Sequence, residues 1–317
     1  MLSDEIRRKL RKLGEAKARP ESESESESEA TADCPGDGGL ARLRQKMLKG
    51  AAKATAAGGG RGEASSARVA TVRRIALPAQ TEGPLVGEEV ANEAGACLAI
   101  RLALGEVADW GDEFWQLLLE FAARDAAGLH HARPEELAFF DIETTGLSAQ
   151  PLFLIGILRA DEGGPHIVQY LARDYAEEAA ALRAGLEALG AARTLVSFNG
   201  RSFDLPYIKD RAAYHRLRID LPKQPHVDLL VHARRRWRGR FADNKLQTLE
   251  TGALGITRTS DIPGHQIPEA YHEFVRSGCA RQMHEILHHN RLDLLTLAAL
   301  VGELLGDAEP KPAVPPA

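Results

Sequence analysis

Two acidic residues stand at the end of a run that otherwise has the composition of a buried β-strand. The run is Phe139–Leu147, with the sequence FFDIETTGL. Because side chains alternate between the two faces of a strand, Asp141 and Glu143 project from the same face. Two carboxylates on one face repel each other and are costly to desolvate, so the pattern indicates a positive charge beside them. The alternative is an ordinary core strand, Leu137–Ile142, whose acids lie in solvent at its end.

Composition limits the class of protein. With 317 residues and 44% hydrophobic content, the chain can build a sizeable core. Its net charge of −5 does not indicate a polyanion partner, yet twelve Lys or Arg stand against five Asp between Arg201 and Lys245. No apolar run approaches the ~20 residues of a membrane span, and the charged N-terminus lacks the apolar core of a signal peptide. We therefore expect a cytoplasmic protein without membrane contact.

The cysteines give a second indication of location. Cys34, Cys97 and Cys279 form no close pair in the sequence and show no metal-ligand spacing. We expect isolated thiols in a reducing compartment and no structural zinc site.

The two ends of the chain differ in composition from the middle. Residues 1–67 hold a short basic segment, Ile6–Ala18, an alternating Glu-Ser tract, Glu21–Glu29, and a stretch rich in Gly, Ala, Lys and Arg. Such segments cannot bury enough apolar surface to offset chain entropy, so we predict a disordered low-complexity tail. Its basic residues could touch nucleic acid, but a solvated tail is the favoured interpretation. Residues 307–317 contain four prolines and are predicted to form a second disordered tail.

Residues 68–133 are predicted to form an N-terminal extension packed on the main domain. Val69–Ala76 and Ala96–Leu104 have strand patterns, and Glu88–Val90 could pair in a hairpin. Asp112–Ala126 has the apolar spacing of a helix. No catalytic group of residues stands out in this extension.

The main domain is predicted to span residues 134–306 as an α/β fold with a mixed central sheet flanked by helices. Three strands would form a meander and be followed by a helix, a fourth strand and further helices to the end of the domain. Ser202 could cap the helix after the fourth strand, and Pro206 would fit its first turn. The predicted elements are strands Leu137–Ile142, Leu152–Ala160, His166–Leu171 and Thr194–Phe198, and helices Ala176–Gly190 and Ala280–Leu305.

Further acids follow in the later elements. Asp204 lies in the segment Asn199–Pro206, where Gly200 permits a tight exit from the strand and the first helical turn favours a carboxylate. Helix capping alone could also explain this Asp. Asp293 lies among leucines on the last helix, an odd place for a charge without a cation partner. His289, four residues before Asp293, shares its helical face, whereas His288 is rotated away.

Taken together and in this order, the three elements resemble the DEDD exonucleases of the ribonuclease H-like superfamily, the DnaQ-like group, and most closely its YprB-type branch. The resemblance covers Leu137 to about Leu304 and implies a ribonuclease H-like fold. It also implies that four acids bind two divalent metal ions, for which Mg²⁺ or Mn²⁺ suits the hard carboxylate oxygens. The implied ligands are Asp141, Glu143, Asp204 and Asp293.

Two cations a few ångströms apart can activate a water and stabilise the entering and leaving oxygens of a phosphodiester displacement. A histidine could then accept the proton of the water near neutral pH. The His-type enzymes of the resembled group place this base five residues before the last Asp, which matches His288. The Tyr-type enzymes place a Tyr four residues before it, which matches His289. We favour His289 as the catalytic base because of the shared helical face, and His288 remains the alternative.

The resemblance also indicates substrate contacts. Thr144, Thr145, Gly146 and Leu147 would hold the terminal nucleotide, and Asn199 and Phe203 would line the cleft. Asp228 would be a structural residue near the site and not a metal ligand. A run of arginines around an aromatic residue suits phosphate contacts and base stacking, although a solvated helix face is the alternative. This run contains Arg234, Arg235, Arg236 and Trp237.

The resulting hypothesis is a two-metal nuclease, a 3′-to-5′ exonuclease acting on single-stranded or frayed ends of nucleic acid. The exonuclease polarity comes from the resemblance and not from the residues. One alternative is a structure-selective endonuclease of the same fold. Another is a catalytically silent nucleic-acid-binding module, which would be expected to have lost one of the acids. The sequence does not choose between DNA and RNA and does not indicate protein partners or an oligomeric state.

Overall fold

The computed structural model describes residues 83–104, 134–161, 163–218, 223–256, 258 and 261–306. The predictions for the two tails, for the strand Val69–Ala76 and for the helix Asp112–Ala126 lie outside these residues.

The strands of the described residues form one seven-stranded mixed sheet in the order β1-β2-β5-β4-β3-β6-β7. The first five strands pair antiparallel, whereas β6 runs parallel to β3 and β7 runs parallel to β6. The predicted meander and mixed sheet are therefore confirmed. The strands are β1 (Glu88–Asn92), β2 (Gly95–Ala103), β3 (Leu137–Thr144), β4 (Leu152–Asp161), β5 (Gly164–Leu171), β6 (Thr194–Ser197) and β7 (His226–Asp228).

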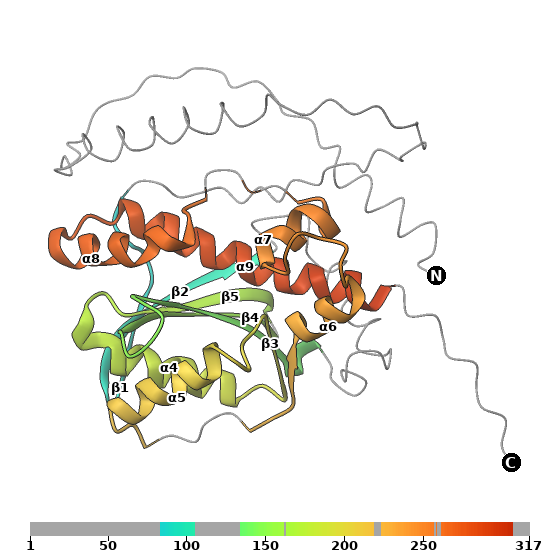
Figure 1. Ribbon diagram of the computed structural model, residues 1–317. Helices are drawn as coiled ribbons and strands as arrows, with labels where there is room; N and C mark the ends of the chain where they lie inside the picture. Colours follow the sequence, from blue (N-terminus) through green and yellow to red (C-terminus); the bar gives the residue numbers. More distant parts are fainter. Residues whose placement is uncertain are drawn as a thin grey trace, which may run out of the picture. The chain divides into compact units, whose positions relative to one another are not determined.

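Helices cover both faces of this sheet, with α4 and α5 on one side and α8 and α9 on the other (Figure 1). Single turns of 3-10 helix lie at Pro134–Glu136, Tyr175–Glu177 and Gly264–Gln266, and a π-helical segment at Glu250–Leu254. None of the helices in the described part of the chain is long and apolar enough to cross a membrane. The helices are α4 (Glu178–Gly190), α5 (Asp204–Tyr214), α6 (Leu229–Arg236), α7 (Leu246–Leu249), α8 (Ile267–Ser277) and α9 (Arg281–Gly306).

The alternation of side chains along β3 separates two parts of the core. Phe139 packs in a cluster with leucines of α9, whereas Phe140 packs in a cluster with residues of α4 and α5. Asp141 and Glu143 are two and four residues from Phe139, so they face α9. Because α9 packs against β3 and β4, these acids lie between the sheet and the last helix.

The loop that leaves β6 is held in place by Asp228. Its carboxylate accepts hydrogen bonds from the backbone N–H of Asn199 at 2.8 Å and of Arg201 at 3.1 Å, and it also caps α6 through the N–H of Leu230. Since β3, β6 and β7 are parallel, their carboxyl ends lie at one edge of the sheet, where open α/β sheets commonly bind ligands. At this edge, Asp228 has a structural role, because its carboxylate accepts hydrogen bonds from backbone N–H groups.

The first turn of α5 differs in one detail from the prediction. Asp204 is the first helical residue, as expected, and Pro206 lies within the first turn. The predicted cap by Ser202 is wrong, because Phe203 occupies the cap position and no side chain caps the helix.

The hairpin predicted around Glu88–Val90 is present, because β1 pairs with β2 in register from Glu88 to Asn92. The second strand then pairs with β5, so this part of the N-terminal region adds two strands to the central sheet. The domain boundaries themselves remain predictions.

The cysteine prediction fails at one position. Cys97 is a buried free thiol, and burial raises its pKa to about 11. Cys279 is engaged in a disulfide, so the three cysteines are not all isolated thiols. The argument for a reducing compartment loses its support, and the cytoplasmic location remains a prediction.

A buried ion pair joins helices α4 and α5 on one face of the sheet. The carboxylate of Glu178 accepts from Nε and Nη2 of Arg211, both at 2.6 Å, and from the backbone N–H of Leu152 at 2.9 Å. His215 lies 2.9 Å from the same carboxylate. Burial alone would raise the pKa of Glu178, but these hydrogen bonds outweigh it and hold the pKa below its ordinary value. The contacts join α4, α5 and the start of β4.

We predict that Glu178→Gln lowers the free energy of unfolding by about 3–5 kcal/mol at neutral pH, because it leaves the buried Arg211 guanidinium without its partner. The pKa of Glu178 is lowered in the folded state, so its contribution is full above the ordinary value of 4.5 and is lost as the pH falls through the folded pKa. Urea unfolding should therefore show a difference between wild type and variant that shrinks in acid.

A matched control is Glu187→Gln on the same helix, which removes the exposed carboxylate of an ion pair with the half-buried Arg183 and should cost less than about 1 kcal/mol. Equal stabilities of Glu178→Gln and wild type at neutral pH would contradict this account of the pair.

Candidate functional site

Four acidic side chains from three elements come together at the edge where the parallel strands end. Asp141 and Glu143 come from β3, Asp204 from the first turn of α5, and Asp293 from α9. Glu143 and Asp204 are 9% and 5% exposed, so water screens their charges little. The structure thus brings the four predicted acids together.

The electrostatics of the cluster are dominated by burial and mutual repulsion. Burial first, and then the charges of Asp293, Glu143 and Asp204, raise the pKa of Asp141 well above its ordinary value. Burial and the charges of Asp293 and Asp204 do the same to the pKa of Glu143. The pKa of Asp204 is raised to about 7, again chiefly by burial. The cluster carries more negative charge than it can hold fully ionised without a cation nearby.

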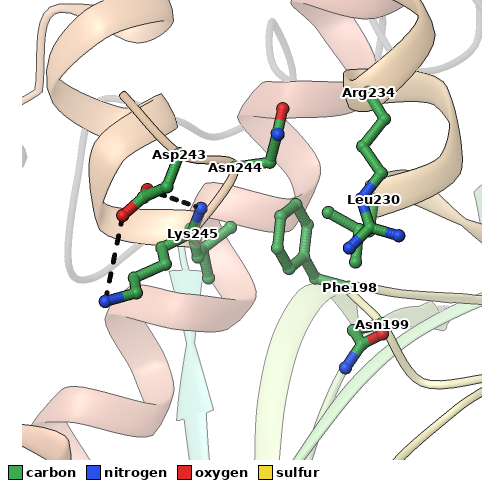
Figure 2. A pocket seen from close by; sticks show the side chains of 8 residues that line it. Phe198, Asn199, Leu230, Arg234, Asp243, Asn244 and Lys245 are labelled. Carbon is green, nitrogen blue, oxygen red and sulfur yellow. Dashed lines mark hydrogen bonds and ion pairs between the residues drawn. The ribbon is translucent and has the colours of Figure 1, made fainter. Parts of the chain in front are cut away.

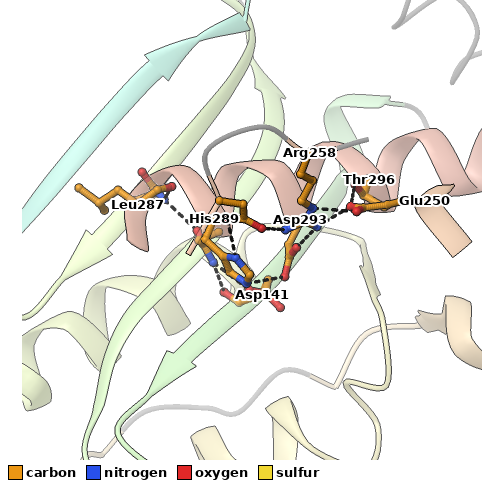
Figure 3. A network of polar contacts seen from close by, with 10 residues as sticks. Asp141, Glu250, Arg258, Leu287, His289, Asp293 and Thr296 are labelled. Atoms are coloured by element: carbon orange, nitrogen blue, oxygen red, sulfur yellow. Dashed lines mark hydrogen bonds and ion pairs between the residues drawn. The ribbon is translucent and has the colours of Figure 1, made fainter. Parts of the chain in front are cut away.

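One cation already touches the cluster. The buried guanidinium of Arg258 contacts the carboxylates of Asp293 and Glu250 (Figure 3). Its Nη1 also lies 3.0 Å from Asp261 Oδ2. Glu250 also accepts a hydrogen bond from the hydroxyl of Thr296. The sequence analysis did not single out Arg258, Glu250 or Asp261, because they lie in segments without strong periodicity and meet the last helix only through the fold.

The two adjacent histidines have different surroundings. Nδ1 of His289 lies 2.8 Å from Asp261 Oδ1, and its Nε2 lies 3.6 Å from Asp293 Oδ2. Burial lowers the pKa of His289, but the hydrogen bond with Asp261 and the charge of Asp293 outweigh it, so the pKa is raised. In contrast, burial lowers the pKa of His288, whose Nδ1 has no hydrogen-bond partner within the described part of the chain. The structure brings His289, and not His288, to the acids.

The donor set fits a hard divalent cation, although the described residues contain no ready-made group of three His, Cys, Asp or Glu ligands. Two of the acids are held by other side chains. Arg258 contacts Asp293, and the amide of Asn290 donates to Asp141 Oδ2 at 2.9 Å. The raised pKa values of Asp141, Glu143 and Asp204 show an excess of negative charge that a cation would neutralise, so the chemistry of the site suits a metal.

The turn after β3 is closed by hydrogen bonds and presents one exposed apolar side chain. Thr144 Oγ1 donates to the carbonyl of Gly146 at 2.7 Å, and the N–H of Thr145 donates to the carbonyl of Pro151 at 2.9 Å. The hydroxyl of Tyr207 also donates to the carbonyl of Gly146. Leu147 is 87% exposed at the tip of this turn. A fixed turn with an exposed leucine beside the acids offers an apolar contact to a ligand.

A pocket of about 610 Å³ opens beside the end of β6. Figure 2 shows the ring of Phe198 in this pocket, with Asn199 next to it and the cationic side chains of Arg234 and Lys245 on either side. Asn199 adopts a left-handed backbone conformation with φ of 66°, as asparagine tolerates better than most residues. Amide, aromatic and cationic groups thus line one space.

The remaining predicted contact residues divide into two groups. Arg235 and Arg236 are exposed on α6, and Phe203 is half-buried against Tyr207 with ring centroids 5.4 Å apart. Trp237 is only 4% exposed and packs in the core between sheet and α9. Its burial contradicts the expectation that a base stacks on Trp237, because the fold directs this apolar ring into the core although its neighbours in the sequence are polar arginines.

The comparisons with known proteins agree with this geometry. The family model of the RNase_H superfamily matches residues 138–305, which contain all four acids. The protein YprB of Bacillus subtilis (strain 168), itself described as uncharacterized, is 36% identical over 168 residues. That match covers 52% of this chain and 40% of YprB, so the chain spans less than half of this relative.

Among solved structures, the family B DNA polymerase from the hyperthermophilic archaeon Pyrobaculum calidifontis is similar with a TM-score of 0.43 and 17% identity. The similarity covers 53% of this chain and 24% of the polymerase chain, and it adds nothing to the assignment. The family model matches more than half of the chain, including the region that carries the acidic cluster. The chain therefore belongs to the RNase_H superfamily, as a YprB-type ribonuclease H-like protein.

Proposed function

We propose that this protein is a metal-dependent nuclease of the DEDD type, a 3′-to-5′ exonuclease that hydrolyses phosphodiester bonds at single-stranded or frayed ends of DNA or RNA. The observation that carries the proposal is the convergence of four acids at the carboxyl end of β3, where burial and the charges of neighbouring acids raise the pKa of Asp141 and of Glu143. A structural core has no use for such repulsion, whereas a site for divalent cations requires it.

The residues that would hold two Mg²⁺ or Mn²⁺ ions are Asp141, Glu143, Asp204 and Asp293. When bound, such ions supply activation of water and stabilisation of the charge on the phosphate oxygens. His289 would accept the proton of the attacking water at Nε2. This nitrogen is free for the role because Nδ1 is hydrogen-bonded to Asp261, and it lies on the side of Asp293.

Substrate would lie across the turn and the pocket described above. The exposed Leu147 would contact the terminal nucleotide, and the pocket would take a neighbouring nucleotide of the strand, with Phe198 as an apolar surface for the base. Arg234 and Arg235, exposed on α6, would contact phosphates of the strand. A substrate that enters by its 3′ end would follow this line from the pocket to the acids.

We predict that Asp204→Asn abolishes hydrolysis while the protein still folds, because removing one carboxylate relieves repulsion. The assay is Mn²⁺-dependent digestion of end-labelled linear and circular single strands of DNA and RNA. Chelation of the metal should stop the wild-type reaction, and circular strands should resist an exonuclease. Asp210→Asn, at an exposed position of the same helix, is the control and should keep full activity. A fully active Asp204→Asn protein would refute the metal site.

For the base, His289→Ala should reduce turnover by roughly 10²–10⁴-fold, the usual loss for a general base. His288→Ala should reduce it far less, because this ring does not reach the acids. Single-turnover rates at saturating Mn²⁺ and substrate measure both. A larger loss for His288→Ala would assign the role to His288 instead, and wild-type rates for both variants would remove histidine from the mechanism.

Replacing Arg234, Arg235 and Arg236 by Ala should weaken binding of a single strand and flatten its salt dependence, by about 0.7 in log–log slope for each phosphate that is no longer neutralised. Fluorescence anisotropy of a labelled oligonucleotide in chelator measures affinity without cleavage. Arg276→Ala on α8 removes an exposed arginine elsewhere and should leave the slope unchanged. If the triple variant keeps the wild-type slope, the arginines form only a solvated helix face.

A further inference from the structure

Three residues form a row across the sheet at the level of the acidic cluster. Asp141 on β3 lies directly opposite Gly156 on β4, and Gly156 lies directly opposite Gln169 on β5. Neighbouring strands are about 4.8 Å apart, so Asp141 and Gln169 are separated by roughly 10 Å on the same face. The residue between them has no side chain, which leaves a hollow.

The side chain of Asn290 from α9 fills this hollow. A Cβ atom at Gly156 would lie 1.9 Å from Asn290 Oδ1, so only glycine admits the amide. Asn290 donates from Nδ2 to Asp141 Oδ2 at 2.9 Å and accepts at Oδ1 from Gln169 Nε2, also at 2.9 Å. Its amide therefore bridges the two outer members of the row.

Arg291 determines the direction of these hydrogen bonds. Arg291 can only donate, and its Nε donates to Gln169 Oε1 at 2.8 Å. This contact turns Nε2 of Gln169 toward Asn290 Oδ1, and it also lets Nε2 donate to the carbonyl of Leu287 at 2.9 Å. The amide of Asn290 must then present Nδ2 to Asp141. We call Arg291, Gln169, Asn290 and Asp141 the hydrogen-bond chain.

Burial makes this arrangement the stable one. Asn290 and Gln169 are both 0% exposed, so water cannot take the place of a missing partner. Reversing either amide would leave buried donors and acceptors unpaired, which is unfavourable where water cannot replace the lost partner.

We propose that Asn290 is a positioning residue, which holds the Asp141 carboxylate by Oδ2 in the orientation that binds a divalent cation, and that Gln169 and Arg291 fix its direction. This inference rests on the proposed function. Residues that hydrogen-bond to a metal ligand and orient it typically contribute about 10–100-fold to metal affinity. Asn290, Gln169 and Arg291 are not among the proposed metal ligands. Asn290 lies between Asp141 and the other two.

The sharpest test is Gln169→Glu, which changes no residue in contact with Asp141. A glutamate still accepts from Arg291 but cannot donate to Asn290 Oδ1, so the Asn290 amide should turn over and present its oxygen to Asp141. The variant keeps a buried partner for Arg291, which favours retention of the fold. We expect its Mn²⁺ affinity, measured by calorimetry, to fall about 10–100-fold below wild type.

The sign of the effect separates this inference from simple charge. An added negative charge would by itself tighten Mn²⁺ binding, so a decrease is diagnostic of the reversed amide. Gln224→Glu makes the same chemical change at a side chain that bonds the carbonyl of Leu189, and it should keep the wild-type affinity. Wild-type or tighter Mn²⁺ binding by Gln169→Glu would overturn the proposal.

A second measurement needs no metal. Asn290→Ala and Asp141→Ala, alone and combined, should show non-additive shifts of the urea midpoint in chelator, because they remove the same hydrogen bond. Additive shifts would overturn the hydrogen-bond chain whatever the nuclease assay gives. Non-additive shifts with no Mn²⁺ binding by wild type would instead refute the metal site of the proposed function, and with it the positioning role.

Discussion

Repulsion among buried carboxylates is the constraint on which the rest of the site depends. Strand alternation places Asp141 and Glu143 on one face, the parallel strand β6 delivers Asp204 to the same edge, and α9 brings Asp293 over it. Burial and the charges of neighbouring acids raise the pKa of Asp141 and of Glu143, so the assembly of the acids opposes folding. Such a local conflict between folding and function is typical of functional sites.

Neighbouring side chains relieve the conflict without removing it. Arg258 places a positive charge on Asp293, and Asn290 donates a hydrogen bond to Asp141. The Arg258 guanidinium contacts only one carboxylate oxygen of Asp293, and the other oxygen lies toward His289. This second oxygen would therefore remain available to a metal ion. The negative charge of the acids is thus only partly neutralised, and a bound divalent ion would neutralise the rest.

Much of the fold could be predicted from the sequence because it follows from local periodicity. Strand alternation indicated β3 and its two acids, and the four-residue spacing on α9 indicated that His289 meets Asp293. Other features depend on contacts between distant segments. Asn290 reaches Gln169 across 121 positions, and Arg258 reaches Asp293 across 35. Trp237 shows the limit of local composition, since its arginine neighbours indicated the surface whereas the fold buries its ring.

The most direct test of the central claim is the anomalous diffraction of Mn²⁺ in crystals of the protein. We predict strong peaks enclosed by the carboxylates of Asp141, Glu143, Asp204 and Asp293, and their loss in crystals of the Asp204→Asn variant. Asn290 should keep its hydrogen bond to Asp141 in the metal-bound structure. Ordered carboxylates with no peak among them at millimolar Mn²⁺ would contradict the metal site, because four mutually repelling acids would then be assembled without a divalent cation.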